Sequence, residues 1–341
     1  MLLVTNRRGP RSEATVTRGR LRRYATRSAV LAMGALIAAS PSATAQATGE
    51  DQASDGDRAA TTTGQQIGQM IGESCADTYV LGVRGSNEPP NDADSTASSD
   101  DVVYPPGTEG LGMGPTVHAF FEEFSASREE SGASAPAGLG ITYPAVRVGE
   151  GLLLYPMVYR DSVDEGSRNL LAALEQINEA CGDDGTDVVV SGVSQGADVI
   201  NTALAIEEER GTGWFDQVSR IVLFGDPSRS AEQSAITAGA ERGEGIFRRV
   251  PLSGFEQDGW MDRNPRVISV CIPGDSVCDP SGDPADAANV TGADGLSPFD
   301  RHQAYVDPEV QVRCPSGEDG EEVFLDGPAC AAAIMAMPTS R

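Results

Sequence analysis

What the sequence lacks excludes several classes of protein. It has no lysine and only two histidines, and its six cysteines form no Cys-x-x-Cys pair. Zinc sites are typically built from such cysteine pairs and from clustered histidines, so we expect no metal site and no cofactor. After residue 47 no apolar run is long enough to cross a bilayer, which argues against stable insertion into a membrane.

The basic residues at the start of the chain suggest a targeting segment. Eight arginines lie between Arg7 and Arg27 with Glu13 as the only acid, and an apolar run follows at residues 29–39. Residues 43–47 contain small side chains that suit a signal-peptidase cleavage site. The whole layout is typical of a secretory signal peptide. A nucleic-acid-binding arm is the alternative, but such arms rarely precede an apolar run. We therefore predict a signal peptide over residues 1–47 and a secreted protein, exported by the general or the twin-arginine route.

The remaining chain is strongly acidic. It carries 17 arginines against 50 acids, a formal net charge of −33. Such a charge repels phosphate backbones and anionic membranes, so we expect no nucleic-acid partner. Residues 48–72 are polar and rich in Gly, Thr and Asp, which is typical of a flexible linker. We predict that residues 73–341 form a single domain.

Short apolar runs alternate with helical periodicity along this domain. Strands are predicted at residues 78–84, 141–146, 187–191, 218–224 and 266–272, the last being the final strand, and helices at 115–124, 161–180 and 195–208. Nearly continuous apolar strands separated by helices indicate a parallel sheet that is covered on both faces. The sequence thus predicts a three-layer α/β/α sandwich with a central, mainly parallel sheet. Residues 87–114 and 280–298, rich in Gly, Pro, Asp and Ser, are predicted loops.

A Gly-x-Ser-x-Gly pentapeptide, residues 192–196, joins one predicted strand to the following helix. In α/β-hydrolases this motif places the serine on a strained turn with its hydroxyl exposed above the sheet. An ordinary glycine-rich turn with a capping serine is the alternative reading. The strand, turn and helix context favours Ser194 as a nucleophile.

A serine hydroxyl needs a base to take its proton and a carboxylate to orient that base. In the α/β-hydrolase order both follow the serine, and His302 is the only histidine after Ser194. His118 is predicted to be a packed or half-exposed helix residue. The residues themselves leave the acid open among five aspartates, namely Asp226, Asp275, Asp279, Asp294 and Asp300.

The segment Cys271-Ile272-Pro273-Gly274-Asp275-Ser276-Val277-Cys278 resembles the Cys-x-x-Gly-Asp-x-Ile/Val-Cys loop of the cutinases, secreted serine esterases of fungi and bacteria. Further pieces are similar to the family in the same order: Cys75, Arg84-Gly85-Ser86, Cys181, Gly-Val-Ser-Gln-Gly around Ser194, and His302-Gln303-Ala304-Tyr305. The resemblance spans residues 75–305 and implies the cutinase type of the α/β-hydrolase fold.

The resemblance also assigns roles. It implies Asp275 as the acid, and an oxyanion hole formed by the hydroxyl and backbone N–H of Ser86 and the backbone N–H of Gln195. An even number of cysteines in an exported protein favours three disulfides, with fifteen pairings open. The family pattern implies the pairs Cys75–Cys181 and Cys271–Cys278, which leaves Cys314–Cys330. Residues after about 306 form a C-terminal extension, and segments 87–114 and 241–260 are insertions relative to compact family members.

These observations predict a secreted, monomeric carboxylic-ester hydrolase that works through an acyl-enzyme. Cutin-like polyesters, acylglycerols and short-to-medium-chain esters are the expected substrates. A thioesterase or a phospholipase is an alternative, because the triad determines acyl transfer whereas the cleft determines the substrate. A catalytically inactive binding or surface protein on the same scaffold is the alternative from another class.

Overall fold

The computed structural model describes residues 68, 71, 74–86, 88, 109–147, 155–232, 235–249, 264–315 and 322–337. All of them lie in one compact unit, residues 52–341. The predicted signal peptide, residues 1–47, lies outside the described residues, and so does the linker 48–72 apart from residues 68 and 71. Most of the insertion 87–114 and residues 250–260 of the second insertion also lie outside them.

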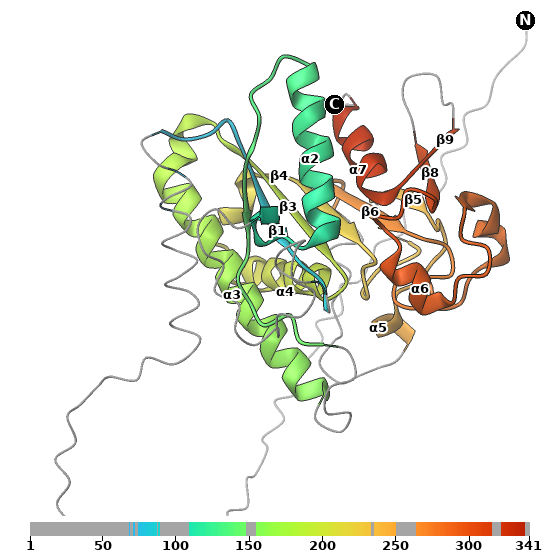
Figure 1. Cartoon of the computed structure of the whole chain (residues 1–341). Helices are drawn as coiled ribbons and strands as arrows, with labels where there is room; N and C mark the ends of the chain where they lie inside the picture. Colours follow the sequence, from blue (N-terminus) through green and yellow to red (C-terminus); the bar gives the residue numbers. More distant parts are fainter. Residues whose placement is uncertain are drawn as a thin grey trace, which may run out of the picture. The chain divides into compact units, whose positions relative to one another are not determined.

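A six-stranded parallel sheet forms the centre of this unit (Figure 1). Its strands are, in spatial order, β2 (Ala137–Gly140), β1 (Thr78–Val83), β3 (Asp187–Val193), β4 (Val218–Phe224), β6 (Val267–Cys271) and β5 (Ile236–Gly239). The strands β1 and β6 are buried along their whole length, as a sheet covered on both faces requires. The predicted fold class is confirmed.

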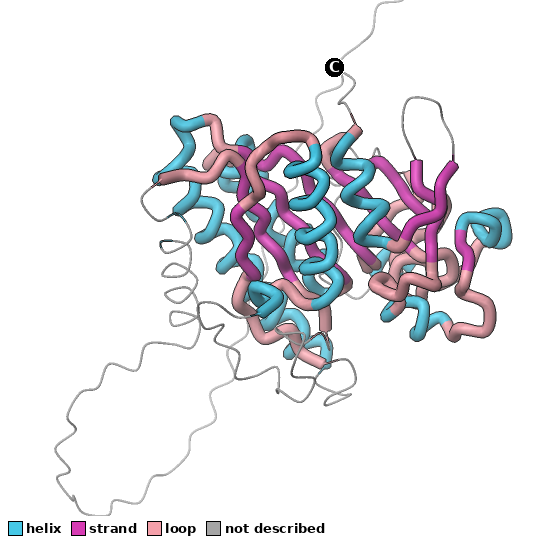
Figure 2. Tube along the Cα trace, turned by 45° about the horizontal axis from the view of Figure 1, so that its top comes forward, coloured by secondary structure: helices cyan, strands magenta, loops and turns pink. Residues whose placement is uncertain are grey.

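Helices cover the two faces of the sheet (Figure 2). The helices α3 (Tyr155–Cys181) and α4 (Gln195–Arg210) pack on one face, whereas α2 (Pro115–Glu130) and α7 (Gly327–Ala336) lie side by side on the other. The side chains of each strand alternate between the faces, with Leu81 and Val190 in the first core and Val80 and Val189 in the second. Short helices connect these elements, namely η2 (Glu109–Gly112), η3 (Gly182–Asp184), η4 (Trp214–Gln217), α5 (Ile246–Arg249), η6 (Pro284–Asn289) and α6 (Pro298–Gln303).

The strand predicted at residues 141–146 is wrong in position. The strand is β2, which ends at Gly140, and residues 141–147 have no regular structure although Ile141 and Tyr143 are buried. Pro144 has no N–H for a sheet ladder, and Ala145 has a φ of 48°, which no strand residue adopts. The apolar run therefore correctly indicated that these residues are buried, but it did not indicate whether they pair with a neighbouring strand.

The C-terminal extension is part of the core, and residues 266–272 are not the final strand. A second, antiparallel sheet contains β7 (Val290–Thr291), β8 (Gln311–Pro315) and β9 (Glu322–Leu325). Val312 and Cys314 of β8 point into the core that α2 and α7 cover, whereas Gln311 and Arg313 are only partly buried. The segment predicted as a loop at 280–298 contains η6 and β7. Predicted helices also start or end elsewhere: α3 begins at Tyr155 and α2 continues to Glu130.

The six cysteines lie in three pairs, each at disulfide distance: the two pairs that the resemblance implied, Cys75–Cys181 and Cys271–Cys278, and the remaining pair, Cys314–Cys330. Cys75–Cys181 joins the residues before β1 to the end of α3, Cys314–Cys330 joins β8 to α7, and Cys271–Cys278 closes the loop after β6. None of the helices in the described part of the chain is both long and apolar enough to cross a membrane.

Candidate active site

Ser194 lies in a sharp turn between β3 and α4. Its φ of 54° and ψ of −115° are strained for a residue with a side chain, and such strain is typical of a nucleophile turn. The turn is so tight that a Cβ atom on Gly196 would lie 2.1 Å from the carbonyl oxygen of Val83 in β1. Only glycine fits at that position, which explains the second glycine of the pentapeptide.

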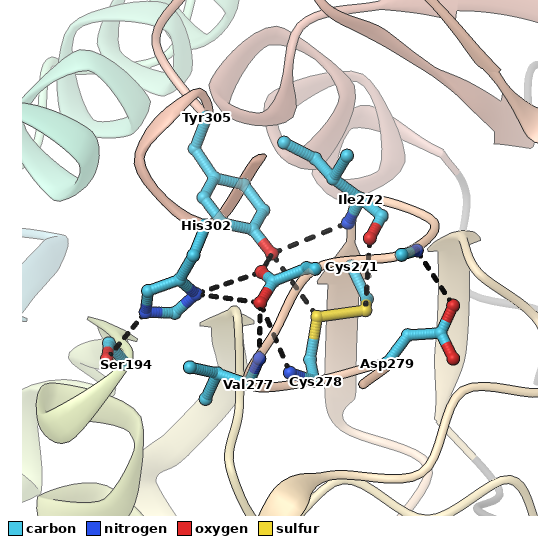
Figure 3. Close-up of polar contacts among 10 residues, drawn as sticks. Ser194, Cys271, Ile272, Val277, Cys278, Asp279, His302 and Tyr305 are labelled. Carbon is cyan, nitrogen blue, oxygen red and sulfur yellow. Dashed lines mark hydrogen bonds and ion pairs between the residues drawn. A yellow bond between two sulfur atoms is a disulfide. The ribbon is translucent and has the colours of Figure 1, made fainter. Parts of the chain in front are cut away.

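His302 lies within hydrogen-bond distance of Ser194. Its Nε2 atom is 2.8 Å from Ser194 Oγ, and its Nδ1 atom is 2.9 Å from both carboxylate oxygens of Asp275 (Figure 3). His302 belongs to α6, whose start is fixed by a capping box between Ser297 and Asp300. A short, capped helix thus brings the imidazole to the carboxyl edge of the sheet.

Asp275 is fully buried in the loop that Cys271 and Cys278 close. Its Oδ1 atom accepts hydrogen bonds from the backbone N–H groups of Val277, at 2.7 Å, and Cys278, at 3.4 Å. Its Oδ2 atom accepts a 2.6 Å hydrogen bond from the hydroxyl of Tyr305 (Figure 3). The carboxylate is therefore held from several sides in the orientation that faces the imidazole.

The other candidate residues lie elsewhere. Among the aspartates, Asp279 accepts from Gly274 N, Asp300 caps α6, Asp226 accepts from Asn201 and Ser228, and Asp294 is exposed. His118 lies on α2, with its Nδ1 atom 3.7 Å from Glu122 Oε2. The structure brings together only Ser194, His302 and Asp275 of the residues considered for a triad.

The residues predicted for the oxyanion hole lie beside the serine. Ser86 Oγ donates a 3.1 Å hydrogen bond to Gln195 Oε1. Gln195 is the first residue of α4, and the first N–H groups of a helix have no acceptor within the helix. Its backbone N–H therefore adds to the positive end of the helix dipole next to Ser194.

Tyr305 contributes to the site in a way that the sequence did not indicate. The tyrosine was part of the resemblance, but no role was assigned to it. Burial raises its pKa well above the usual value of 10, and the neighbouring Asp275 raises the pKa further. The hydroxyl thus stays protonated and donates to Asp275. The three-residue spacing between His302 and Tyr305 was the signal that could have found it.

A cleft of about 180 Å³ opens at Ser194 and His302. Its walls include Val193, Phe299 and Val306, and the last two side chains are 46% and 41% exposed. Large apolar side chains at the mouth of a cleft are suited to contact an acyl chain. No group of three or more metal-ligating side chains occurs among the residues that the structure describes.

Comparisons with known proteins identify a family and several similar solved structures. Residues 102–307 match the cutinase family model, a range that includes Ser194, Asp275 and His302 and begins after Ser86. Similar solved structures include a cutinase-like protein from Cryptococcus sp. (19% identity, TM-score 0.39, 62% of this chain and 82% of that chain). A Trichoderma reesei cutinase in complex with a phosphonate inhibitor is also similar, with 18% identity, a TM-score of 0.39, and coverage of 82% of this chain and 88% of that chain. Lysin B from Mycobacteriophage D29 has 17% identity, a TM-score of 0.32, and coverage of 58% of this chain and 64% of that chain. The search of curated proteins gave no match.

Proposed function

Since the chain belongs to the cutinase family, we propose that it is a secreted serine esterase that hydrolyses carboxylic esters through an acyl-enzyme on Ser194. The observation that carries the proposal is the continuous set of contacts from Ser194 Oγ through the His302 imidazole to the buried carboxylate of Asp275. A serine, a base and an orienting acid in this geometry are the parts that acyl transfer requires.

In the first half of the reaction, His302 Nε2 takes the proton from Ser194 Oγ while the oxygen attacks the ester carbonyl. Asp275 accepts the Nδ1–H hydrogen bond and so fixes the tautomer and orientation of the imidazole. His302 then gives the proton to the leaving alcohol. In the second half, His302 takes a proton from a water molecule while the water oxygen attacks the acyl carbon. The bond from that carbon to Ser194 Oγ then breaks, His302 returns the proton to Ser194 Oγ, and the acid is released.

Negative charge develops on the carbonyl oxygen only when the tetrahedral species forms. Donors that already point at this position stabilise the transition state, and each can contribute about 3 kcal/mol. The proposal assigns this role to the hydroxyl and N–H of Ser86 and the N–H of Gln195. The Ser86 hydroxyl has a single proton, which it gives to Gln195 Oε1 in the free protein and turns to the oxyanion when the tetrahedral species forms.

The cleft and the charge of the protein narrow the substrate class. Phe299 and Val306 offer apolar contacts for an acyl chain, whereas a net charge of −33 after the leader slows the approach to anionic lipid surfaces. We therefore assign neutral esters as substrates: polyesters, acylglycerols and soluble short-to-medium-chain esters. Three cysteine pairs at disulfide distance suit an oxidising, extracellular location.

A series of p-nitrophenyl esters with increasing acyl length tests this function. The wild-type protein is expected to hydrolyse them with a preference for one range of chain lengths, and Ser194→Ala to lower kcat at least about 10³-fold. Circular dichroism shows whether the variant is folded. No hydrolysis of any ester by the wild type would indicate an inactive scaffold, and full activity of Ser194→Ala would remove the assignment of the nucleophile.

A further inference from the structure

The carboxylate of Glu88 connects the segment that carries Ser86 to the start of α2. Its Oε2 atom accepts a 2.8 Å hydrogen bond from the backbone N–H of Gly85. Its Oε1 atom accepts from the hydroxyl of Thr116, at 2.6 Å, and from the backbone N–H of Thr116, at 3.3 Å. Thr116 lies in the first turn of α2, so the carboxylate also satisfies a free N–H group at a helix start.

The same short segment is fixed by a buried arginine. Arg84 is 1% exposed and donates to the carbonyl oxygen of Glu88, at 2.9 Å, and to those of Tyr143 and Pro144. The N–H of Glu88 in turn donates to the carbonyl oxygen of Gly85. Residues on both sides of Ser86 are thus hydrogen-bonded to each other and to the surrounding chain.

Little space separates this segment from the nucleophile turn. A Cβ atom on Gly85 would lie 3.1 Å from the carbonyl oxygen of Val193 and 3.4 Å from the Cβ atom of Ser194. Glu88, Thr116 and Ser86 all line the cleft at Ser194. A shift of the segment therefore changes where the donors of Ser86 point relative to Ser194.

The charge of Glu88 does not by itself favour catalysis. A carboxylate in the wall of the cleft repels the oxyanion that forms on the substrate. Burial also raises the pKa of Glu88, while the hydrogen bonds from Gly85 and Thr116 and the nearby Arg84 lower it. Any benefit of Glu88 to catalysis therefore comes from its hydrogen bonds to Gly85 and Thr116 and not from its negative charge.

We propose that Glu88 is a positioning residue of the oxyanion hole: by bridging Gly85 and Thr116 it holds Ser86 where the negative charge of the tetrahedral species develops. The inference rests on the proposed function, since it needs Ser86 to act as an oxyanion donor.

The test compares Glu88→Ala with Glu207→Ala. Glu207 is buried, whereas Glu88 is half-buried, and like Glu88 it accepts from a threonine hydroxyl, that of Thr212, and from a backbone N–H, that of Trp214. It lies near the end of α4, about 20 Å along the helix from Ser194. Both variants lose a similar set of hydrogen bonds, but only one of them loses the contact with the Ser86 segment.

We expect Glu88→Ala to lower kcat for p-nitrophenyl esters by about 10- to 100-fold with KM changed less than about threefold, because misplaced donors weaken transition-state binding alone. Glu207→Ala should lower the melting temperature and leave kcat within about threefold. Glu88→Gln keeps an acceptor for Gly85 and should recover most of the kcat. Equal kcat values for Glu88→Ala and Glu207→Ala would overturn the proposal.

A double-mutant cycle with Ser86→Ala shows whether Glu88 acts through Ser86. The loss of kcat caused by Glu88→Ala should be smaller in the Ser86→Ala background than in the wild type, whereas additive effects contradict the proposal. If Glu88→Ala does not fold, Thr116→Val removes one partner of the carboxylate and should give a smaller loss of kcat at unchanged KM; unchanged kcat there contradicts the proposal. Failure of the proposed function is distinguishable, because the wild-type protein itself would then hydrolyse none of the esters.

Discussion

The two parts of the candidate site are positioned in different ways. Ser194 is placed by the local backbone, in a turn where β3 passes directly into α4 and where Gly196 touches β1. Asp275 lies in the loop that the Cys271–Cys278 disulfide closes, and His302 lies in the capped helix α6. The hydroxyl of Tyr305 donates to Asp275 and helps to hold it facing His302. The nucleophile therefore depends on the sheet, and its partners depend on contacts that cross the chain.

The largest effect on kcat is expected from a substitution of Asp275. A substitution of the nearby buried Asp279 serves as its control. Asp275→Asn should lower kcat about 10³-fold or more, because the amide no longer orients the imidazole of His302. Asp279→Asn is the matched control, since Asp279 is equally buried but accepts from Gly274 and Ser281 instead. Steady-state kinetics on a soluble ester gives the comparison. A crippled Asp279→Asn beside an active Asp275→Asn would show that the wrong acid was chosen.

Removing one cysteine pair at a time tests whether that pair stabilises the fold or positions the catalytic acid. Cys75 and Cys181 are 106 positions apart, so replacing both by serine should lower the free energy of unfolding by about 5 kcal/mol in the chain-entropy model. Cys271 and Cys278 are only 7 positions apart, so the same replacement should lower it by about 2 kcal/mol.

Activity at a temperature where both variants are folded completes that comparison. The variant without Cys271 and Cys278 should lose kcat, because Asp275 lies inside that ring, whereas the variant without Cys75 and Cys181 should keep it. Urea denaturation and initial rates measure the two quantities. Loss of kcat only in the Cys75 and Cys181 variant would contradict the division of the site.

The difference between Ser194, which the local backbone positions, and its two partners, which contacts between distant segments position, explains what the sequence could predict. The turn around Ser194 follows from residues that are adjacent in the chain, and the parallel sheet follows from runs of apolar strand residues. Asp275 could not be chosen among five aspartates by pattern alone, since its distinction is a contact with His302, 27 residues away. Only the resemblance pointed to it.

Other features could not be predicted because they depend on packing. Glu88 is one of 51 acidic residues, and its partner Thr116 lies 28 positions away. The strand predicted at residues 141–146 failed because apolar side chains indicate burial but not pairing. The sheet of β7, β8 and β9 was missed because its strands are only two to five residues long and β7 is separated from β8 by residues 292–310.

A smaller effect on stability is expected from Asp226, which is buried behind the site. Burial raises its pKa from 3.8 to about 6, despite hydrogen bonds from Ser228 and Asn201. The folded state then holds the proton more tightly than the unfolded state. Its contribution to stability is fully present below pH 3.8 and is lost as the pH rises through about 6.

Asp226→Asn removes this titration. Relative to the variant, the wild type should therefore lose about 3 kcal/mol of unfolding free energy between pH 4 and pH 7, an order-of-magnitude figure from a shift of about two pKa units. Urea denaturation of both proteins across this range measures the difference. Parallel stability curves for the two proteins would show that Asp226 does not titrate in this range.

The smallest expected effect concerns Tyr305. Tyr305→Phe keeps the ring packed against Phe224 and removes only the hydroxyl that donates to Asp275. Hydrogen bonds to charged groups contribute about 1.5 to 3 kcal/mol, so kcat should fall about 10-fold with little change in KM. Wild-type kcat in this variant would mean that the loop amides of Val277 and Cys278 suffice to hold the acid.

The most direct test of the account is covalent labelling with a fluorophosphonate followed by peptide mapping. The reagent forms a stable bond only with a serine whose proton a base removes, so labelling reports the Ser194 and His302 pair itself. We predict one label per molecule on the peptide that contains Ser194, and almost none in His302→Ala, which should remain folded by circular dichroism. Labelling of another serine, or equal labelling of Ser194 in His302→Ala, would contradict the account.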